Sequence, residues 1–157
     1  MDAALLTDRH EASMGLGVPG PEVEIRRLIA DWEDALCSRN LERLMAFYCH
    51  DVVLFDVHPP FRVEGIERVR ELWEDALPLI PQRLECRNLR IVADLRAAFA
   101  HWCFRPEGAV DRPVVPVWIR VSAGYRKVGG HWKIAHEHVS LPVDPISNQA
   151  VSVTELL

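Results

Sequence analysis

The sequence predicts a single α+β domain, with helices in its first half and mostly antiparallel strands in its second half. Apolar residues recur at helical spacing after Pro21 and again after Gly65, whereas residues 83–141 alternate between apolar and polar side chains. Helices followed by strands are typical of an α+β domain whose helices pack on one face of a sheet. The length of 157 residues is enough for one domain with a buried core.

The chain divides into three parts. Residues 1–20 are expected to form a flexible N-terminal segment, because they end in glycines and prolines that interrupt regular structure. Residues 21–145 are expected to form the domain itself, and residues 146–157 a C-terminal tail.

Three helices are expected before most of the strands. The first follows Pro21, the second is capped by Asn40, and the third follows Gly65. A strand begins at Asp51 and is stopped by Pro59, which cannot donate to a hydrogen-bond ladder. The four remaining strands are expected at residues 83–95, 97–105, 114–128 and 131–141.

The last hairpin predicts which side chains meet across two strands. Gly129 and Gly130 have the composition of a two-residue turn, which places Val128 opposite His131. Because successive side chains of a strand point to opposite faces, this register assigns every later residue of the hairpin to one face.

In that register, His136 and His138 share the buried face with Trp132. Glu137 then lies on the opposite face, where an ion pair with Arg120 is expected. A slip by one residue would exchange the two faces, and the apolar pattern is the argument against such a slip.

Composition excludes several classes of partner. The net charge is -5, and the 18 lysines and arginines are scattered, so a nucleic-acid partner is not expected. No segment approaches the roughly 20 apolar residues that cross a bilayer, so no membrane partner is expected. The first twenty residues do not resemble a signal peptide, and the 4 cysteines are spread singly. These features predict a cytoplasmic protein with reduced thiols.

Several segments together resemble a known family. They are "DVVLFDVHPPFRVEG" at 51–65, Trp73, "VWIRVS" at 117–122 and the pattern W-x-I-x-H-E-H-x-S-x-P that ends at Pro142. Over roughly residues 22–150 the chain is similar to the SnoaL-like branch of the nuclear transport factor 2-like superfamily. Ketosteroid isomerases and the association domain of calcium/calmodulin-dependent kinase share that fold.

This resemblance implies a cone-shaped α+β roll, with three N-terminal helices packed on a strongly bent, mostly antiparallel sheet. It also implies a homodimer and a pocket between the helices and the concave sheet. The superfamily includes isomerases, dehydratases, cyclases and non-enzymatic binding modules, so the function depends on the site and not on the fold.

The two histidines of the closing motif allow three interpretations. His136 and His138 are core residues, or one of them is a general acid or base, since imidazole titrates near neutrality. The third interpretation is a metal site, which needs a further ligand such as Asp56, His58 or His101. Nothing in their spacing requires a metal.

Asp56 is the carboxylate best placed for proton abstraction. It interrupts an apolar strand just before Pro59, where the pocket mouth is expected, and apolar neighbours there would raise its pKa. Alternatively, it caps the turn into Pro59. His58 either exchanges a proton with Asp56 or faces water. By analogy with the superfamily, His101 is expected to face the pocket.

The leading hypothesis is a small homodimeric protein that binds a hydrophobic organic molecule. It would carry out acid-base chemistry of the isomerase, dehydratase or cyclase type, without a cofactor or metal. Asp56 would be the base, and one of His101, His136 or His138 the proton donor. Whether the protein is an enzyme at all stays open in the sequence.

Four side chains are predicted to bind the ligand: Trp32, Tyr48, His58 and Trp73. The aromatic residues among them could equally be core residues. The alternative function is a non-enzymatic ligand-binding or dimerisation module, whose cavity is filled or whose polar groups satisfy one another. A metal-dependent enzyme is the third possibility.

Overall fold

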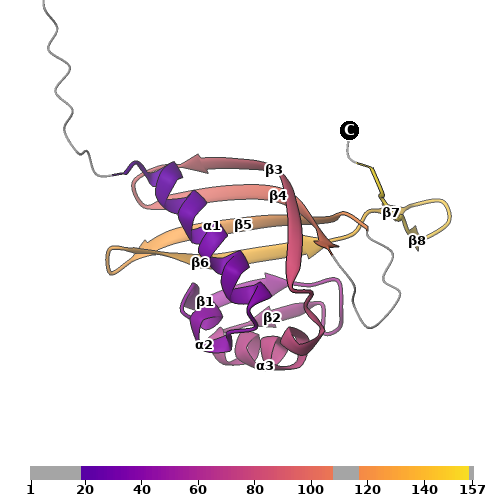
Figure 1. Cartoon of the computed structure of the whole chain (residues 1–157), viewed down its shortest axis with the longest axis horizontal. Helices are drawn as coiled ribbons and strands as arrows, with labels where there is room; N and C mark the ends of the chain where they lie inside the picture. Colours follow the sequence, from indigo (N-terminus) through magenta and orange to yellow (C-terminus); the bar gives the residue numbers. More distant parts are fainter. Residues whose placement is uncertain (1–18, 108–116, 156–157) are drawn as a thin grey trace, which may run out of the picture.

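The computed structural model of the chain describes residues 19–107 and 117–155 (Figure 1). Residues 1–18, which make up most of the segment expected to be flexible, lie outside the described residues, as do residues 114–116 of an expected strand. Among the described helices, none is long and apolar enough to span a membrane.

The expected helices are present. Their bounds are Pro21–Cys37 for α1, Leu41–Met45 for α2 and Ile66–Ala76 for α3, with a short 3-10 helix at Leu77–Leu79 (η1). Pro21 occupies the first turn of α1, where a missing N–H leaves no bond unmade. The side chain of Asn40 accepts a hydrogen bond from the backbone N–H of Arg43 and so caps α2.

The described strands form one large sheet and one small hairpin. Their bounds are Tyr48–Phe55 (β1), Arg62–Glu64 (β2), Arg83–Ala93 (β3), Ala97–Glu107 (β4), Ile119–Val128 (β5), His131–Ser140 (β6), Val143–Asp144 (β7) and Gln149–Ala150 (β8). The large sheet has the order β2-β1-β6-β5-β4-β3, and β7 pairs with β8. The backbone N–H of Trp118 donates to the carbonyl of Val153, so the end of the chain lies against the start of β5.

The predicted antiparallel meander is confirmed for β3 to β6. β1 differs, because it runs parallel to β6 at the other edge of the meander. A parallel neighbour needs a long connection, and here the chain from β1 to β6 includes α3 and the other three long strands. The sheet is therefore mostly antiparallel, with one parallel pair.

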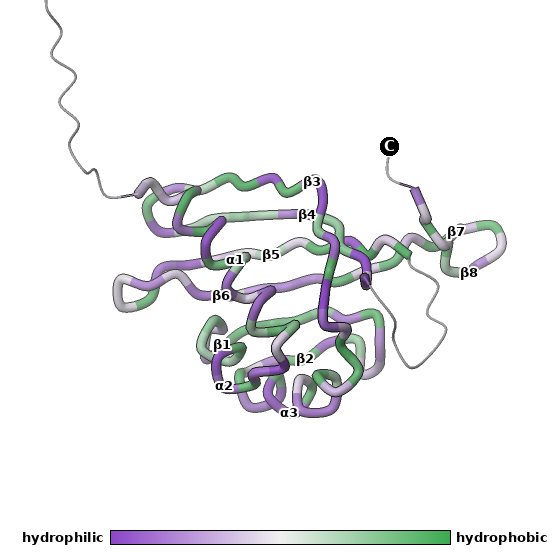
Figure 2. The backbone as a smooth tube through the Cα atoms, viewed as in Figure 1, coloured by the Kyte–Doolittle hydropathy of each residue, from purple (hydrophilic) through white to green (hydrophobic). Residues whose placement is uncertain are grey.

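α1 lies across one face of the sheet and packs against β3, β4 and β6 (Figure 1). We call this the inner face of the sheet, and the opposite one the outer face. The side chains of α1 that are buried there are Ile25, Leu28, Ile29, Trp32, Ala35 and Leu36. α3 is mostly hydrophilic (Figure 2) and buries only Val69 and Trp73. The core therefore lies between the helices and the inner face, and α1 contributes the largest share of its helical side chains.

The last hairpin begins as the sequence predicts. Gly129 and Gly130 have φ angles of 58° and 83°, which glycine adopts without strain. Their turn places Val128 opposite His131, and the pairing continues in this register through Ile134. Up to this point the predicted faces of the two strands are confirmed.

β6 then contains a bulge at Ala135. Ile134 pairs with Tyr125, but the next pair joins His136 to Gly124, so Ala135 has no partner across the ladder. Because side chains alternate with a period of two, one extra residue exchanges the inner and outer positions of everything that follows in β6.

The bulge overturns two predictions. Glu137 turns to the inner face and is only 2% exposed, while His136 and His138 turn to the outer face. The expectation that both histidines lie on the buried face is therefore wrong. The expected ion pair between Arg120 and Glu137 is wrong as well, because Arg120 is exposed on the outer face, with the sheet between the two side chains.

Candidate functional site

Glu137 belongs to a buried hydrogen-bond network that joins four elements. Its Oε2 accepts a hydrogen bond of 2.9 Å from the hydroxyl of Tyr48. The same hydroxyl oxygen accepts hydrogen bonds from Nε1 of Trp32, at 3.1 Å, and from Nε1 of Trp73, at 3.2 Å. α1, α3, β1 and β6 each contribute one of the four side chains, which places the network where the helices meet the sheet.

Burial changes the acidity of this network. The pKa of Glu137 is raised from 4.5 to about 7: burial raises it most, the hydrogen bond from Tyr48 lowers it, and the charge of nearby Asp56 raises it. Burial, together with the charge of Glu137, also raises the pKa of Tyr48 well above its usual value, so Tyr48 stays a proton donor. A carboxyl group with a pKa about 7 can both accept and release a proton near neutrality.

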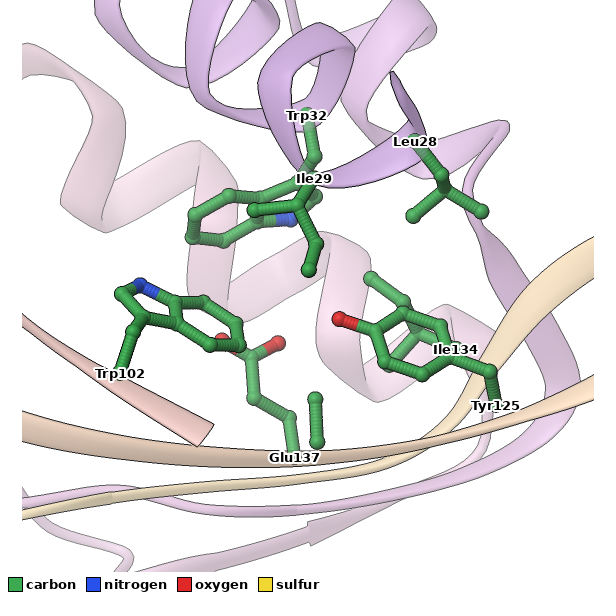
Figure 3. Close-up of a pocket in the computed structure, with 8 residues that line it drawn as sticks. Leu28, Ile29, Trp32, Trp102, Tyr125, Ile134 and Glu137 are labelled. Carbon is green, nitrogen blue, oxygen red and sulfur yellow. The ribbon is translucent and has the colours of Figure 1, made fainter. Parts of the chain in front are cut away.

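An apolar chamber surrounds the carboxyl group of Glu137 (Figure 3). The rings of Trp32 and Trp102 meet edge-on, with their centroids 6.4 Å apart. Side chains fill the chamber and leave no room for a water molecule. The residues that line it are Leu28, Ile29, Trp32, Trp102, Ala123, Tyr125, Ile134 and Glu137.

Tyr125 supplies a second polar group to this chamber. Its hydroxyl points into the space beneath Ile29, as does the carboxyl group of Glu137 (Figure 3). Burial and the charge of Glu137 raise the pKa of Tyr125, and no hydrogen bond from the described residues contributes to that pKa. The hydroxyl is therefore a protonated donor facing the same chamber as Glu137.

Asp56 lies just beyond the end of β1 and makes the contacts of a turn cap. Its Oδ1 accepts a hydrogen bond of 3.1 Å from the backbone N–H of His58 and lies 3.4 Å from Nδ1 of the same residue. The side chain of His58 is 85% exposed, so it does not face the chamber. The effect of Asp56 on the site is electrostatic: its negative charge raises the pKa of Glu137.

The three histidines with a predicted catalytic role lie on the outer face. Nδ1 of His136 is 2.9 Å from the carbonyl oxygen of Val53, and Phe55 packs edge-on against both His136 and His138. His101 is exposed on the same face, since Ala98, Ala100 and Trp102 take the buried positions of β4. The expectation that His101 faces the chamber is therefore wrong.

The family model that matches this chain describes a SnoaL-like domain and covers residues 25–144. The chain belongs to the SnoaL-like family. The search of curated proteins finds no match to it.

Solved structures share the fold of this SnoaL-like domain. An NTF2-like protein of unknown function from Pseudomonas putida is 31% identical, with a TM-score of 0.77, over 86% of this chain and 96% of that one. A ketosteroid isomerase-like protein from Erwinia carotovora atroseptica is 17% identical, with a TM-score of 0.65, over 76% and 94%. A protein of unknown function with a cystatin-like fold from Nostoc punctiforme is 22% identical, with a TM-score of 0.61, over 78% and 90%.

Within the described part of the SnoaL-like domain, no group of three histidine, cysteine, aspartate or glutamate side chains could hold a metal ion. His136 and His138 therefore have no third ligand there from Asp56, His58 or His101. The four cysteines are free thiols: Cys37, Cys49, Cys86 and Cys103.

Sequence reasoning missed Glu137 and Tyr125 as members of this site. A signal for Glu137 was present, because Val139 is apolar and falls on the inner face only if the register slips by one residue after Ile134. Val139 pairs with Val121 and packs against the core. Reading both apolar ends of β6 together would have indicated a bulge between Ile134 and Val139, although not that it lies at Ala135 and so turns Glu137 inward.

Proposed function

We propose that this SnoaL-like domain binds a small, uncharged, mostly apolar organic molecule between α1 and the inner face, and exchanges a proton with it through Glu137. The reaction would be of the isomerase, dehydratase or cyclase type and would use no cofactor. The observation that carries the proposal is a buried carboxyl group with a pKa about 7, enclosed by aromatic side chains.

Each polar group has a distinct role in this proposal. Glu137 takes a proton from a carbon next to a carbonyl group and returns it elsewhere on the molecule. The hydroxyl of Tyr125 donates to the carbonyl oxygen and stabilises the negative charge that develops there. Burial raises the pKa of Glu137, and the charge of Asp56 adds to that rise, so Asp56 supports the base instead of acting as the base.

Ligand entry requires a movement of the chamber wall. Because no water-sized space remains among the side chains, Trp102 or α1 must shift before a ligand can reach Glu137. Trp32 would then touch the ligand, whereas Tyr48 and Trp73 would act behind Glu137. The ligand would replace contacts between aromatic side chains and would not break a hydrogen bond of the Tyr48 network.

The proposed chemistry predicts that the protein accelerates hydrogen exchange in 2-tetralone, a neutral aromatic ketone with acidic protons beside its carbonyl group. In D₂O at pH 7.5, the wild-type rate measured by proton NMR should exceed that of buffer, and Glu137→Gln should lower it by about 100-fold or more. Tyr125→Phe should lower it about 10-fold, because one donor to the oxygen is lost.

His101→Ala separates this site from the one predicted from sequence, since it should leave the exchange rate unchanged. A rate that survives Glu137→Gln but falls in His101→Ala would contradict the proposal. Wild-type protein that binds 2-tetralone, measured by tryptophan fluorescence, without exchanging its protons would instead support a binding module. One observation favours that alternative: the hydroxyl of Tyr48, the N–H groups of Trp32 and Trp73 and Oε2 of Glu137 already satisfy one another.

We also propose that two copies of the chain form a homodimer through their outer faces. Val92 and Phe99 are 70% and 48% exposed there, beside the exposed His101 and His138. Five strands of eight to eleven residues present a face of roughly 800 Å² at ordinary strand spacings, which is about what each partner buries in a stable complex.

The dimer proposal predicts that Phe99→Glu converts the protein from a dimer into a monomer of 17.9 kDa. A buried, unpaired carboxylate within the interface would oppose association. Leu95→Glu is the matched control, because Leu95 is 76% exposed in the turn between β3 and β4 and lies outside the face. Light scattering after size exclusion gives the mass, and a wild-type protein that is monomeric at about 50 μM would contradict the proposal.

A further inference from the structure

The hydroxyl group of Tyr48 has its full hydrogen-bonding capacity occupied. A phenolic oxygen can accept two hydrogen bonds and donate one. Here it accepts from Nε1 of Trp32 at 3.1 Å and from Nε1 of Trp73 at 3.2 Å, and it donates to Oε2 of Glu137 at 2.9 Å. Because an indole N–H is a donor only, neither tryptophan can receive the Tyr48 proton.

We propose that Trp32 and Trp73 are positioning residues: they direct the hydroxyl proton of Tyr48 toward Oε2 of Glu137. This leaves Oε1 as the oxygen of Glu137 that exchanges protons. The assignment of Oε1 as the proton-exchanging oxygen rests on the proposed function. The arrangement of the two indoles around Tyr48 does not.

Packing keeps both indoles aimed at the same oxygen. The rings of Trp32 and Trp73 meet edge-on, with their centroids 6.3 Å apart, so each ring limits the rotation of the other. Trp32, Trp73, Tyr48 and Glu137 are all between 2% and 8% exposed, so water does not compete for these hydrogen bonds. Without one indole, a lone pair of Tyr48 would be open and its donation to Glu137 would weaken.

The chemical consequence is that the two carboxyl oxygens of Glu137 have different roles. Oε2 accepts from Tyr48 in both protonation states, so the carboxyl proton resides on Oε1 when Glu137 is neutral. When Glu137 is ionised, Oε1 offers its lone pair. Two N–H donors also polarise the Tyr48 hydroxyl and strengthen its bond to the carboxylate, which lowers the pKa of Glu137.

The test measures the titration of Glu137 in ligand-free protein labelled with ¹³C at the glutamate carboxyl carbon. Trp73→Phe should raise the titration midpoint of Glu137 by about half a pH unit or more, because Tyr48 becomes a weaker donor. Trp102→Phe is the matched control. It makes the same side-chain change at another buried tryptophan, yet Nε1 of Trp102 makes no hydrogen bond to Tyr48, so the midpoint should stay in place.

Two additional variants make the test decisive. If Trp73→Phe does not fold, benzothienylalanine at position 73 keeps the shape of the ring and removes only the N–H. In the Tyr48→Phe background, Trp73→Phe should cause no further shift, because the indole acts through Tyr48. Equal shifts in Trp73→Phe and Trp102→Phe, or a shift that persists without the Tyr48 hydroxyl, would overturn the inference.

This titration and the exchange of 2-tetralone protons can fail separately. A protein without exchange activity but with the predicted shift would retain the positioning of Tyr48 and lose the proposed function. Exchange activity without the shift would retain the proposed function and contradict the positioning of Tyr48 by the two indoles.

Discussion

Tyr48→Phe is expected to lower the free energy of unfolding by about 3–5 kcal/mol at pH 7, as the sum of several buried groups that lose a partner at about 1–3 kcal/mol each. The change removes one oxygen but leaves the indole N–H groups of Trp32 and Trp73 without an acceptor, and Glu137 without its donor. All of these groups are buried, so water cannot replace the lost hydroxyl without opening the core.

Tyr125→Phe is the matched control for this prediction. Tyr48 and Tyr125 are both 3% exposed, but hydrogen bonds affect the pKa of Tyr48 alone. Removal of the Tyr125 hydroxyl should therefore change the unfolding free energy by less than about 1 kcal/mol. Urea unfolding of both variants gives the comparison, and equal losses would show that the network does not stabilise the fold as described.

The wild-type protein is expected to lose about 3 kcal/mol of stability between pH 4.5 and pH 7 through Glu137 alone. The unfolded chain releases this proton near pH 4.5, whereas the folded protein holds it until about pH 7. Between these values the folded state binds more protons than the unfolded state, so stability falls as pH rises, by about 1.4 kcal/mol per pH unit. The contribution is complete below pH 4.5 and lost above pH 7.

Glu137→Gln isolates this effect, because glutamine can accept the hydrogen bond from Tyr48 and does not titrate. The unfolding free energy of the variant should be closest to that of the wild type near pH 4.5. At pH 8 it should exceed the wild-type value by about 2–3 kcal/mol. Groups such as Asp51 and Glu85 have lowered pKa values, so they act on stability below the same window and in both proteins. Parallel urea-unfolding curves across pH 5 to 8 would show that Glu137 titrates normally in the folded state.

Local patterns predicted much of the fold. Helical spacing predicted α1 and α3, and the pair Gly129–Gly130 predicted both the turn and the register from Val128 to Ile134. These features depend on neighbours within one helix or one hairpin, where the alternation of side chains follows directly from the sequence. The parallel pairing of β1 with β6 was not predicted, because it joins segments about eighty residues apart.

The candidate site was predicted only in part. Trp32, Tyr48 and Trp73 were selected as aromatic residues near a pocket, and the structure joins all three to Glu137 through the hydroxyl of Tyr48. Asp56 was selected as the base, but its contacts are those of a turn cap. A carboxylate that interrupts an apolar strand is visible in a sequence, whereas the partners that hold it are not.

By itself, the sequence determined the helices, the long strands, the last turn and, through its closing motif, the family. The tertiary structure alone decided which carboxyl group is buried. One extra residue at Ala135 exchanges the faces of β6, which sends Glu137 inward and His136 outward. The physical reason is that a strand repeats every two residues, so a single bulge reverses every later assignment, and only contacts with distant segments set the position of the bulge.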